Sequence, residues 1–236
     1  MARADGRRSN ELRPLRIHCR YLKSARESVL VEMGNTRVIC VATVDESVPP
    51  FLRGSGQGWI TGEYGMLPRS SPSRIPRESI RGRVKGRTHE IQRLIGRSLR
   101  AAVDLRALGD RTITVDCDVI EADGGTRTAA INGGFVALVE ALRVLGLERT
   151  ALRSFIAAVS VGIKEGKVLL DIDYVEDSSA EVDMNVVMNS EGKYIEVQGT
   201  AEGAVFSGGD LERMLKSAGR GISQIIRAQK KALRWK

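Results

Sequence analysis

The chain has 236 residues, which is enough for one large domain or two small ones with a buried core. It is 42% hydrophobic and 28% charged, as globular proteins are, and its 4% of aromatic residues argues against a sheet that stacks RNA bases. Its formal net charge of +8 is compatible with a polyanionic partner. The three cysteines are far apart, and neither a secretory signal nor an apolar run of membrane length is present. We therefore expect a cytoplasmic protein with no membrane partner.

The first part of the chain predicts β-strands. Residues 26–40 have the pattern of a hairpin that turns at Gly34-Asn35, because these residue types tolerate the positive φ of a tight turn. Residues 51–67 are rich in glycine, but they contain neither GxGxxG nor a following Gly-Lys-Ser/Thr, which excludes a nucleotide fingerprint. We expect a bulged strand there.

A polar loop over residues 68–87 leads into the first predicted helix. Apolar residues recur at three- and four-residue spacing over 88–108, and Gly109 is a suitable residue to end the helix. Residues 113–120, ITVDCDVI, alternate between apolar and polar types, which predicts a strand.

The remaining elements are helices and strand pairs. We expect a helix over 128–145, a hairpin over 159–173, paired strands over 182–188 and 194–198, and a last helix from Asp210, as its N-cap, to about Leu233. Gly133 and Gly134 would each cost about 1 kcal/mol inside a helix, so we expect another element to pack closely there. Since no sequence repeat is present, we predict one α+β domain over residues 1–236, with a subdivision near residue 150 as the alternative.

Charge is divided unevenly along the chain. Between Pro68 and Arg100 there are ten Lys or Arg and two acids, whereas between Gly166 and Glu202 there are nine acids and two lysines. Arginine makes bidentate contacts to phosphate, so the basic block favours the backbone of a single RNA strand as its ligand. The alternative is a basic face that is only solvated. The candidate RNA-binding residues are Arg69, Arg74, Arg77, Arg81 and Arg83.

The segment ADGGTRTAAINGG, residues 122–134, has the composition of an anion site. It joins a predicted strand to a predicted helix, and the first amides of a helix carry a partial positive charge without an intrahelical partner. Gly124 and Gly125 let an anion approach the backbone, while Thr126 supplies a hydroxyl and Arg127 a full charge. The alternative is that Thr126 caps the helix and Arg127 is solvated.

Asp177 and Asp183 are the candidate metal-binding carboxylates. We expect Asp177 in a loop and Asp183 at the start of an apolar strand, where an acid needs a cation or a chemical role. Two carboxylates in an open site suit Mg²⁺, which retains several waters. The alternative is that Asp183 caps a turn or pairs with an arginine. Only two histidines are present, and the sequence contains no HExxH, GxSxG or Walker motif.

Five separated blocks of the sequence point to one family. In chain order they are RGSGQGWITGEYGMLPRS, GRTHEIQRLIGRSLRAAVDL, DCDVIEADGGTRTAAI, DIDYVEDSSAEVDMNVVM and IEVQGTAEG, and they resemble the bacterial ribonuclease PH family over essentially the whole chain. The resemblance implies mixed sheets packed with helices, related to the βαβ module of a small-subunit ribosomal protein. It also implies a nucleotidyltransferase, namely a phosphorolytic 3′-to-5′ exoribonuclease. Such an enzyme trims transfer RNA precursors and other structured RNA with inorganic phosphate and releases nucleoside diphosphates.

The resemblance further implies the roles of individual residues. Arg87, Gly125, Thr126 and Arg127 would bind the substrate phosphate, and Asp177 and Asp183 would be the catalytic residues and the ligands of Mg²⁺. Gly62 departs from the alanine that the family pattern leads us to expect. Family members form a homo-hexameric ring, a trimer of dimers, which we expect here. One alternative is a non-catalytic RNA-binding ring subunit of an exosome-like assembly; another is a hydrolytic metal-dependent nuclease, which would not need the anion site.

Overall fold

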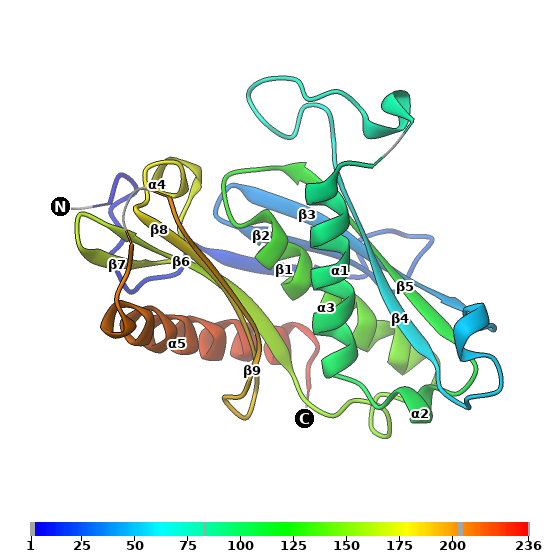
Figure 1. Ribbon diagram of the computed structural model, residues 1–236. Coiled ribbons are helices and arrows are strands. Elements are labelled where there is room, and N and C mark those ends of the chain that lie inside the picture. Colours follow the sequence, from blue (N-terminus) through cyan, green and yellow to red (C-terminus); the bar gives the residue numbers. More distant parts are fainter. Residues whose placement is uncertain (1–2, 83, 203–204, 236) are drawn as a thin grey trace.

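The computed structural model describes residues 3–82, 84–202 and 205–235. In this part of the chain two β-sheets lie side by side, and helices pack against them and between them (Figure 1). The predicted α+β class, with mixed sheets packed against helices, is confirmed.

The first sheet has the strand order β1-β2-β3-β5-β4. Its strands are β1 (Leu15–Cys19), β2 (Ser28–Met33), β3 (Thr36–Asp45), β4 (Trp59–Met66) and β5 (Thr112–Glu121). β2 and β3 form the predicted hairpin, and Gly34 takes a φ of 59° in its turn. β1 is an antiparallel edge strand that the sequence pattern did not predict.

The glycine-rich segment before β4 does not form the bulged strand that we expected. Residues 59–66 pair with β5 in a continuous parallel register. Gly54 and Gly56 precede the strand and have positive φ, in a loop that follows the short 3-10 helix Pro50–Leu52. Gly54 and Gly56 therefore allow the turns of this loop, and the strand begins after these two glycines.

Helices on one face of the first sheet connect β4 to β5. A short 3-10 helix (Glu78–Arg81) precedes α1 (Gly86–Ala101), which packs against β4, and α2 (Leu105–Leu108) follows α1. The prediction of one helix up to residue 108 is wrong. The Asp104 side chain caps a separate helix by accepting a hydrogen bond from the Arg106 amide at 3.1 Å.

α3 (Thr126–Val144) lies between the two sheets and is buried on almost every side. The predicted close approach at its two glycines is confirmed. A Cβ on Gly133 would lie 2.7 Å from Cγ1 of Val31, and a Cβ on Gly134 would lie 3.2 Å from Cγ1 of Val115. Both contacts are with strands of the first sheet, so these glycines let the helix lie close to that sheet.

The second sheet is antiparallel and has the order β7-β6-β8-β9. Its strands are β6 (Ile156–Lys164), β7 (Lys167–Leu170), β8 (Val182–Asn189) and β9 (Tyr194–Ala201), and both predicted strand pairs are present. A single helical turn, α4 (Tyr174–Asp177), connects β7 to β8. The prediction of a loop at Asp177 is therefore wrong, because Asp173 and Glu176 form a capping box that stabilises this turn.

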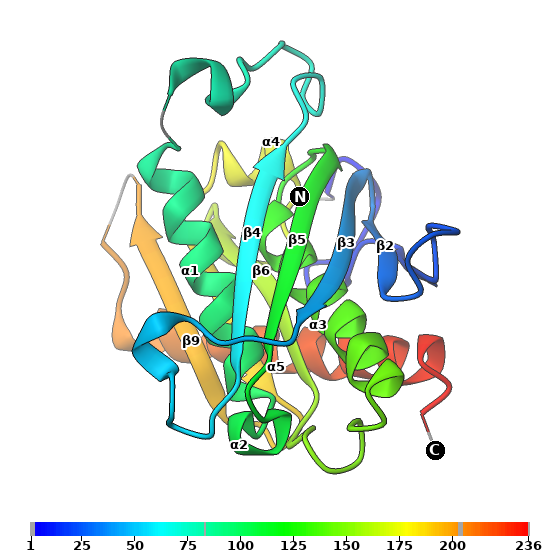
Figure 2. The same ribbon diagram turned by 90° about the vertical axis from the view of Figure 1, so that its right-hand side faces the viewer.

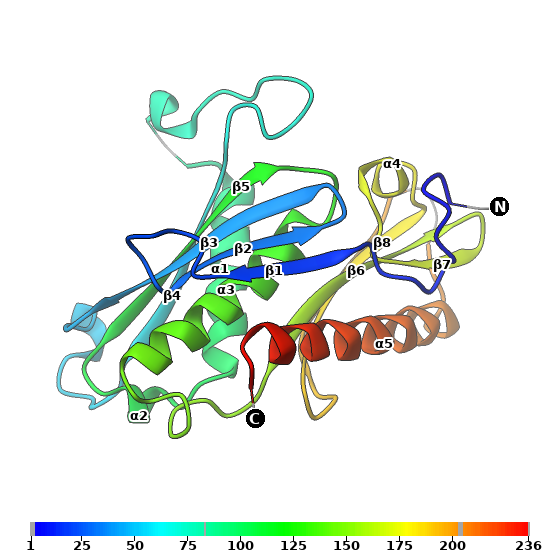
Figure 3. The ribbon, with the colours of Figure 1, turned by 180° about the vertical axis from the view of Figure 1, so that it is seen from behind.

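α5 (Gly208–Ala232) packs against the second sheet and reaches β1 of the first (Figure 3). The prediction that Asp210 is its N-cap is wrong. Ser207 is the N-cap, and Asp210 is the third helical residue, whose carboxylate accepts a hydrogen bond from the Ser207 amide at 2.9 Å. Both residue types suit a cap, and here they act together in a capping box.

Side chains of both sheets and of α1, α3 and α5 form one hydrophobic core. The core fixes the directions of β4, β5 and α3, on which the candidate site depends. No helix within the described residues is long and apolar enough to span a membrane.

Candidate active site

The predicted site residues gather at one end of the molecule, where β4 and β5 end and where α1 and α3 begin (Figure 2). α4 lies at the same end (Figure 1). Because β4 and β5 are parallel, their carboxyl ends are adjacent, and ligands of open sheets bind outside such ends. The fold thus brings together segments from four separate parts of the sequence.

The glycine loop (residues 123–125) connects β5 to α3. Gly124 and Gly125 have φ values of 74° and 62°, in the left-handed region that other residues disfavour. A Cβ on Gly124 would lie 2.6 Å from the carbonyl carbon of Asp173, so the loop packs directly against the start of α4. Gly125 is the N-cap of α3 and provides no side-chain cap. The first amides of α3 therefore present unpaired donors and a partial positive charge to the site.

Thr126 is the first residue of α3 and not its N-cap, so the simple capping alternative is wrong. Its Oγ1 accepts a hydrogen bond from the Tyr64 hydroxyl at 2.9 Å. Burial raises the pKa of Tyr64, whereas this bond and the nearby charges of Arg87 and Arg127 lower it, and the net pKa lies above the ordinary value. Tyr64 is thus a protonated donor at neutral pH. The sequence analysis missed it, because its position in β4 gives no sign that it reaches α3.

Arg127 is held within the site, contrary to the alternative of a solvated side chain. Its side chain is 19% exposed, and its Nη1 donates to Oε1 of Gln198 at 3.0 Å and lies 3.4 Å from Oε1 of Glu90. The Gln198 amide donates to the same Glu90 oxygen at 2.9 Å. These contacts use Nη1, and a guanidinium group has five N–H donors, so donors remain for an anion. The sequence analysis did not identify Gln198 or Glu90.

Arg87 supplies a second cation at the same end. It is the second residue of α1, and its side chain is exposed. The charges of Arg87 and Arg127 both lower the pKa of Asp177 and that of Tyr64. The two guanidinium groups therefore lie near the same carboxylate and the same phenol, although they are 40 positions apart in the printed sequence.

Asp177 and Asp183 lie close enough to influence each other. Burial raises the pKa of both carboxyl groups, and the negative charge of Asp177 raises that of Asp183 further, while Arg127 lowers both. Asp183 is the second residue of β8, as predicted. The ion pairs formed among the described residues involve neither aspartate, so pairing with an arginine does not explain Asp183. Neighbouring carboxyl groups with raised pKa values favour a proton or a divalent cation between them.

Glu202 is a third carboxylate near the aspartates. Its negative charge raises the pKa of both Asp177 and Asp183. The sequence analysis counted it within the acidic block without giving it a role. Within residues 3–82, 84–202 and 205–235, no group of three or more His, Cys, Asp or Glu could by itself hold a metal ion. Two carboxylates are nevertheless a sufficient protein contribution for Mg²⁺, which completes its shell with water and phosphate oxygens.

The arginine loop (residues 68–85) projects from the same end of the molecule, between β4 and α1 (Figure 1). The side chains of Arg69, Arg74 and Arg77 are exposed. Arg81 ends a short 3-10 helix, but its side chain is outside the described part of the structure, and so is the whole of Arg83. The loop adjoins Arg87, because it leads directly into α1.

Comparison with known proteins places the chain in a family. Residues 11–143 match the model of the 3′ exoribonuclease family, domain 1, and residues 154–221 match the model of domain 2 of that family. The ribonuclease PH of Corynebacterium kroppenstedtii is 56% identical over 235 residues, which cover 98% of this chain and 92% of that protein.

Solved structures share the fold. Rice (Oryza sativa) Rrp46 has a TM-score of 0.79 at 21% identity, over 98% of this chain and 100% of that one. The archaeal exosome core has a TM-score of 0.77 at 18% identity, over 97% and 91% of the two chains. The Archaeoglobus fulgidus exosome with RNA bound to the active site also has a TM-score of 0.77, at 21% identity, over 100% and 93%. From the two family models and the relative at 56% identity, the chain belongs to the 3′ exoribonuclease family, in its bacterial ribonuclease PH branch.

Proposed function

We propose that Arg87, Arg127 and the start of α3 bind the inorganic phosphate that this phosphorolytic 3′-exoribonuclease consumes. The observation that carries the proposal is that Arg87 and Arg127 act on the same carboxylate, Asp177, and that Arg127 is in the first turn of α3, whose N-cap Gly125 provides no side-chain cap. An anion there would accept charge-assisted hydrogen bonds from Arg127 and from the backbone. Thr126, oriented by Tyr64, adds a hydroxyl.

We propose Asp177 and Asp183 as the catalytic residues and as the ligands of Mg²⁺. Their raised pKa values support this role, because a divalent cation between them would relieve both burial and mutual repulsion. When bound, Mg²⁺ supplies charge stabilisation at the reacting phosphate. Asp183 itself is a suitable group to hold a proton for the departing 3′ oxygen.

The reaction follows from these roles. An oxygen of inorganic phosphate attacks the last phosphorus of the RNA, the bond from this phosphorus to the 3′ oxygen breaks, and a nucleoside diphosphate is released. The 3′ oxygen takes up a proton and becomes the new end of the RNA. The task of Arg87 and Arg127 is to keep the phosphate in line with the scissile bond, since positioning and charge stabilisation dominate phosphoryl transfer.

The substrates that we propose are transfer RNA precursors and other structured RNAs with an accessible 3′ end. The exposed Arg69, Arg74 and Arg77 beside the site support contact with an RNA backbone. We also propose that the chain forms a homo-hexameric ring, a trimer of dimers, in the cytoplasm. The three unbonded cysteines, Cys19, Cys40 and Cys117, fit such a reducing compartment.

The first experiment is a product analysis. The protein is incubated with a 3′-extended transfer RNA and Mg²⁺, with and without inorganic phosphate, and the released nucleotides are identified. We expect nucleoside diphosphates only when phosphate is present. Nucleoside monophosphates without phosphate would instead indicate a hydrolytic nuclease, and no release would indicate a non-catalytic ring subunit, which the relative at 56% identity does not favour.

Two substitutions test the residue roles. Arg127→Ala should raise the phosphate KM and slow turnover, and an unchanged phosphate dependence would remove Arg127 from the phosphate site. Asp183→Asn should abolish the reaction while RNA binding stays nearly intact, and near-normal turnover would contradict its role. Light scattering of the purified protein tests the hexamer.

A further inference from the structure

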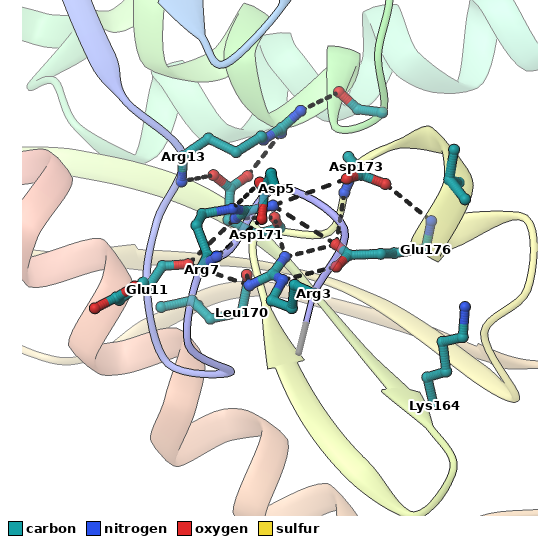
Figure 4. Close-up of polar contacts among 12 residues, drawn as sticks. Arg3, Asp5, Arg7, Glu11, Arg13, Lys164, Leu170, Asp171, Asp173 and Glu176 are labelled. Carbon is teal, nitrogen blue, oxygen red and sulfur yellow. Dashed lines mark hydrogen bonds and ion pairs between the residues drawn. The ribbon is translucent and has the colours of Figure 1, made fainter. Parts of the chain in front are cut away.

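The N-terminal arm (residues 3–13) runs along α4 and the end of β7 before it enters β1 (Figure 4). Three of its arginines are nearly buried: the side chains of Arg3, Arg7 and Arg13 are 3%, 9% and 3% exposed. Arg8, in the same arm, is 82% exposed. Burying a guanidinium group is unfavourable unless it is fully paired, so the three buried arginines must have specific partners.

Arg3 is paired with the helix that carries Asp177. Its Nε and Nη2 donate to the two carboxylate oxygens of Glu176 at 2.7 and 2.6 Å, which is a bidentate pair. Glu176 also accepts from the Asp173 amide at 3.1 Å and so completes the capping box of α4. Since Asp177 is the next residue, the position of its carboxylate depends on how Arg3 holds Glu176.

Arg13 is paired with the glycine loop. Its Nη1 donates to the Asp123 carbonyl at 2.6 Å, and its Nη2 forms an ion pair with Oδ1 of Asp171 at 2.7 Å. The same Nη2 lies 2.8 Å from the place where a Cβ on Gly125 would stand. Arg13 therefore supports the glycine loop through the Asp123 carbonyl and packs directly against Gly125, the N-cap of α3.

Asp171 connects these two supports. Its carboxylate accepts from the Arg13 side chain and from the Arg13 amide at 2.8 Å, while its carbonyl accepts from Arg3 at 3.0 Å and from Arg7 at 2.9 Å. Its φ of 52° is left-handed, a conformation that a residue other than glycine keeps only where its surroundings hold it. One buried residue is thus bound to all three arginines (Figure 4).

We propose that the N-terminal arm is a positioning element with two separate tasks in the reaction. Arg13 sets the glycine loop for phosphate, and Arg3, through Glu176, sets Asp177 for its work with Asp183. The arginines touch neither substrate nor metal; they act through Asp171 and Glu176. This inference rests on the proposed function, because it assigns a purpose to supports of that same site.

The test uses conservative substitutions in the full-length protein. Arg13→Lys and Arg3→Lys keep the positive charge but lose the planar fork that makes two directed contacts. Arg8→Lys is the matched control, since it makes the same change in the same arm at an exposed side chain. Circular dichroism and melting curves first establish that each variant is folded at the assay temperature.

The two tasks predict different kinetic signatures. Arg13→Lys should raise the phosphate KM by about 5- to 20-fold and change kcat by less than about 2-fold, because a less firmly held glycine loop binds the anion more weakly in the ground state and in the transition state alike. Arg3→Lys should lower kcat by about 10-fold and leave the phosphate KM unchanged. Arg8→Lys should match the wild type in both. A merely structural arm would produce no such division between KM and kcat.

Binding measured without turnover provides the second readout. Inorganic phosphate alone should raise the melting temperature of the wild type and of Arg3→Lys, but should raise that of Arg13→Lys much less. Titration calorimetry with Mg²⁺ alone should show weaker binding to Arg3→Lys than to Arg13→Lys. If Arg13→Lys does not fold, Asp171→Asn, which keeps the shape of the acceptor, is measured in its place.

The outcomes separate this inference from the proposed function. If Arg127→Ala raises the phosphate KM and folded Arg13→Lys does not, the positioning role is wrong and the phosphate site stands. If neither variant changes the phosphate KM, the phosphate site itself is wrong, and the task of Arg13 falls with it. If Arg3→Lys and Arg13→Lys show the same division between KM and kcat, the two tasks are not separate and the proposal is overturned.

Discussion

The N-terminal arm and the arginine loop are both rich in arginine, but their arginines are used in opposite ways. In the arm, Arg3 and Arg13 are 3% exposed and bind carboxylates and carbonyls of distant segments. In the loop, Arg69, Arg74 and Arg77 are exposed to solvent. The difference shows that the charge of an arginine is not enough to predict its role. The role depends on whether the fold brings acceptors to it.

Counting charges along the chain selects only one of these regions. The arginine loop belongs to a block with few acids, so it stands out as basic. The arm is mixed with its own acids, Asp5 and Glu11, and its decisive partners are in the acidic block far along the sequence. The positive charge of its buried arginines is neutralised inside the molecule, whereas Arg69, Arg74 and Arg77 of the loop are exposed to solvent.

The largest expected effect comes from removing a buried arginine of the arm. Arg13→Ala leaves the Asp171 carboxylate, which is 0% exposed, without its counter-ion, so we expect the free energy of unfolding to fall by about 3–5 kcal/mol. Urea denaturation measures this loss. Adding Asp171→Asn to Arg13→Ala should recover part of it, because no buried charge then remains unpaired. A loss below about 1 kcal/mol would mean that the arm is held in some other way.

Removing the loop arginines should instead affect RNA and leave stability intact. For the triple variant Arg69→Ala, Arg74→Ala and Arg77→Ala, the free energy of unfolding should change by no more than about 0.5 kcal/mol. The plot of log affinity for single-stranded RNA against log salt should lose about 2 units of slope, at roughly 0.7 per phosphate contact. The same slope as the wild type would indicate that the loop serves subunit contact or structure and does not grip RNA.

A third difference concerns the dependence of stability on pH. Burial raises the pKa of Glu176, but the hydrogen bonds from Arg3 and from the Asp173 amide, together with the charges of Arg3 and Arg7, lower it more, so the pKa is below the ordinary value of 4.5. A carboxyl group with a lowered folded pKa contributes stability above its unfolded pKa and loses it as the pH falls through the folded pKa. Stability should therefore decrease below about pH 4.5, and Glu176→Gln should make the decrease shallower. Chemical denaturation between pH 3 and pH 7 tests this. If the stability of the wild type and that of Glu176→Gln fall in parallel with pH, the Arg3–Glu176 pair does not contribute to the pH dependence.

The smallest effect is expected within the arm itself. Arg8→Ala removes an arginine whose side chain is 82% exposed and whose ion-pair partner, Glu11, is also exposed to solvent. Surface ion pairs contribute little, so the free energy of unfolding should change by less than about 0.5 kcal/mol. A larger loss would mean that position in the arm, and not burial, makes its arginines important.

The sequence predicted the elements whose pattern is long and regular. Periodicity located β2 and β3, α3, α5 and the paired strands of the second sheet, and the glycine pair at Gly133 correctly predicted a close contact. Periodicity failed where one or two side chains determine the local backbone conformation. The cap at Asp104 divides a predicted helix, and a capping box creates α4 from four residues.

The candidate site was predictable where it is local and not where it is assembled. GGTRT indicated an anion site and the acidic segment indicated Asp177 and Asp183 from their own residues, whereas Arg87 was indicated by the family resemblance alone. Tyr64, Gln198 and Arg13 could not be found in this way. Tyr64 and Gln198 lie in blocks that carry the family resemblance, but nothing in those blocks indicates the contacts with Thr126 and Arg127, and Arg13 reaches the glycine loop from a segment 110 residues earlier. Their contribution depends on distances between elements, which periodicity and composition do not contain.

The long sequence separation between the arm and its partners also determines when during synthesis these contacts can form. Arg3 and Glu176 are 173 residues apart, and Arg13 and Asp171 are 158 apart, so each of these arginines is synthesised well before its partner. At about 5–20 residues per second, this interval is roughly 8–35 s on the ribosome. Until then Arg13 lacks the carboxylate that holds it against the glycine loop, and α4 has not yet been made. The proposed site therefore stays incomplete until the segment that carries Asp171, Asp177 and Asp183 has been synthesised.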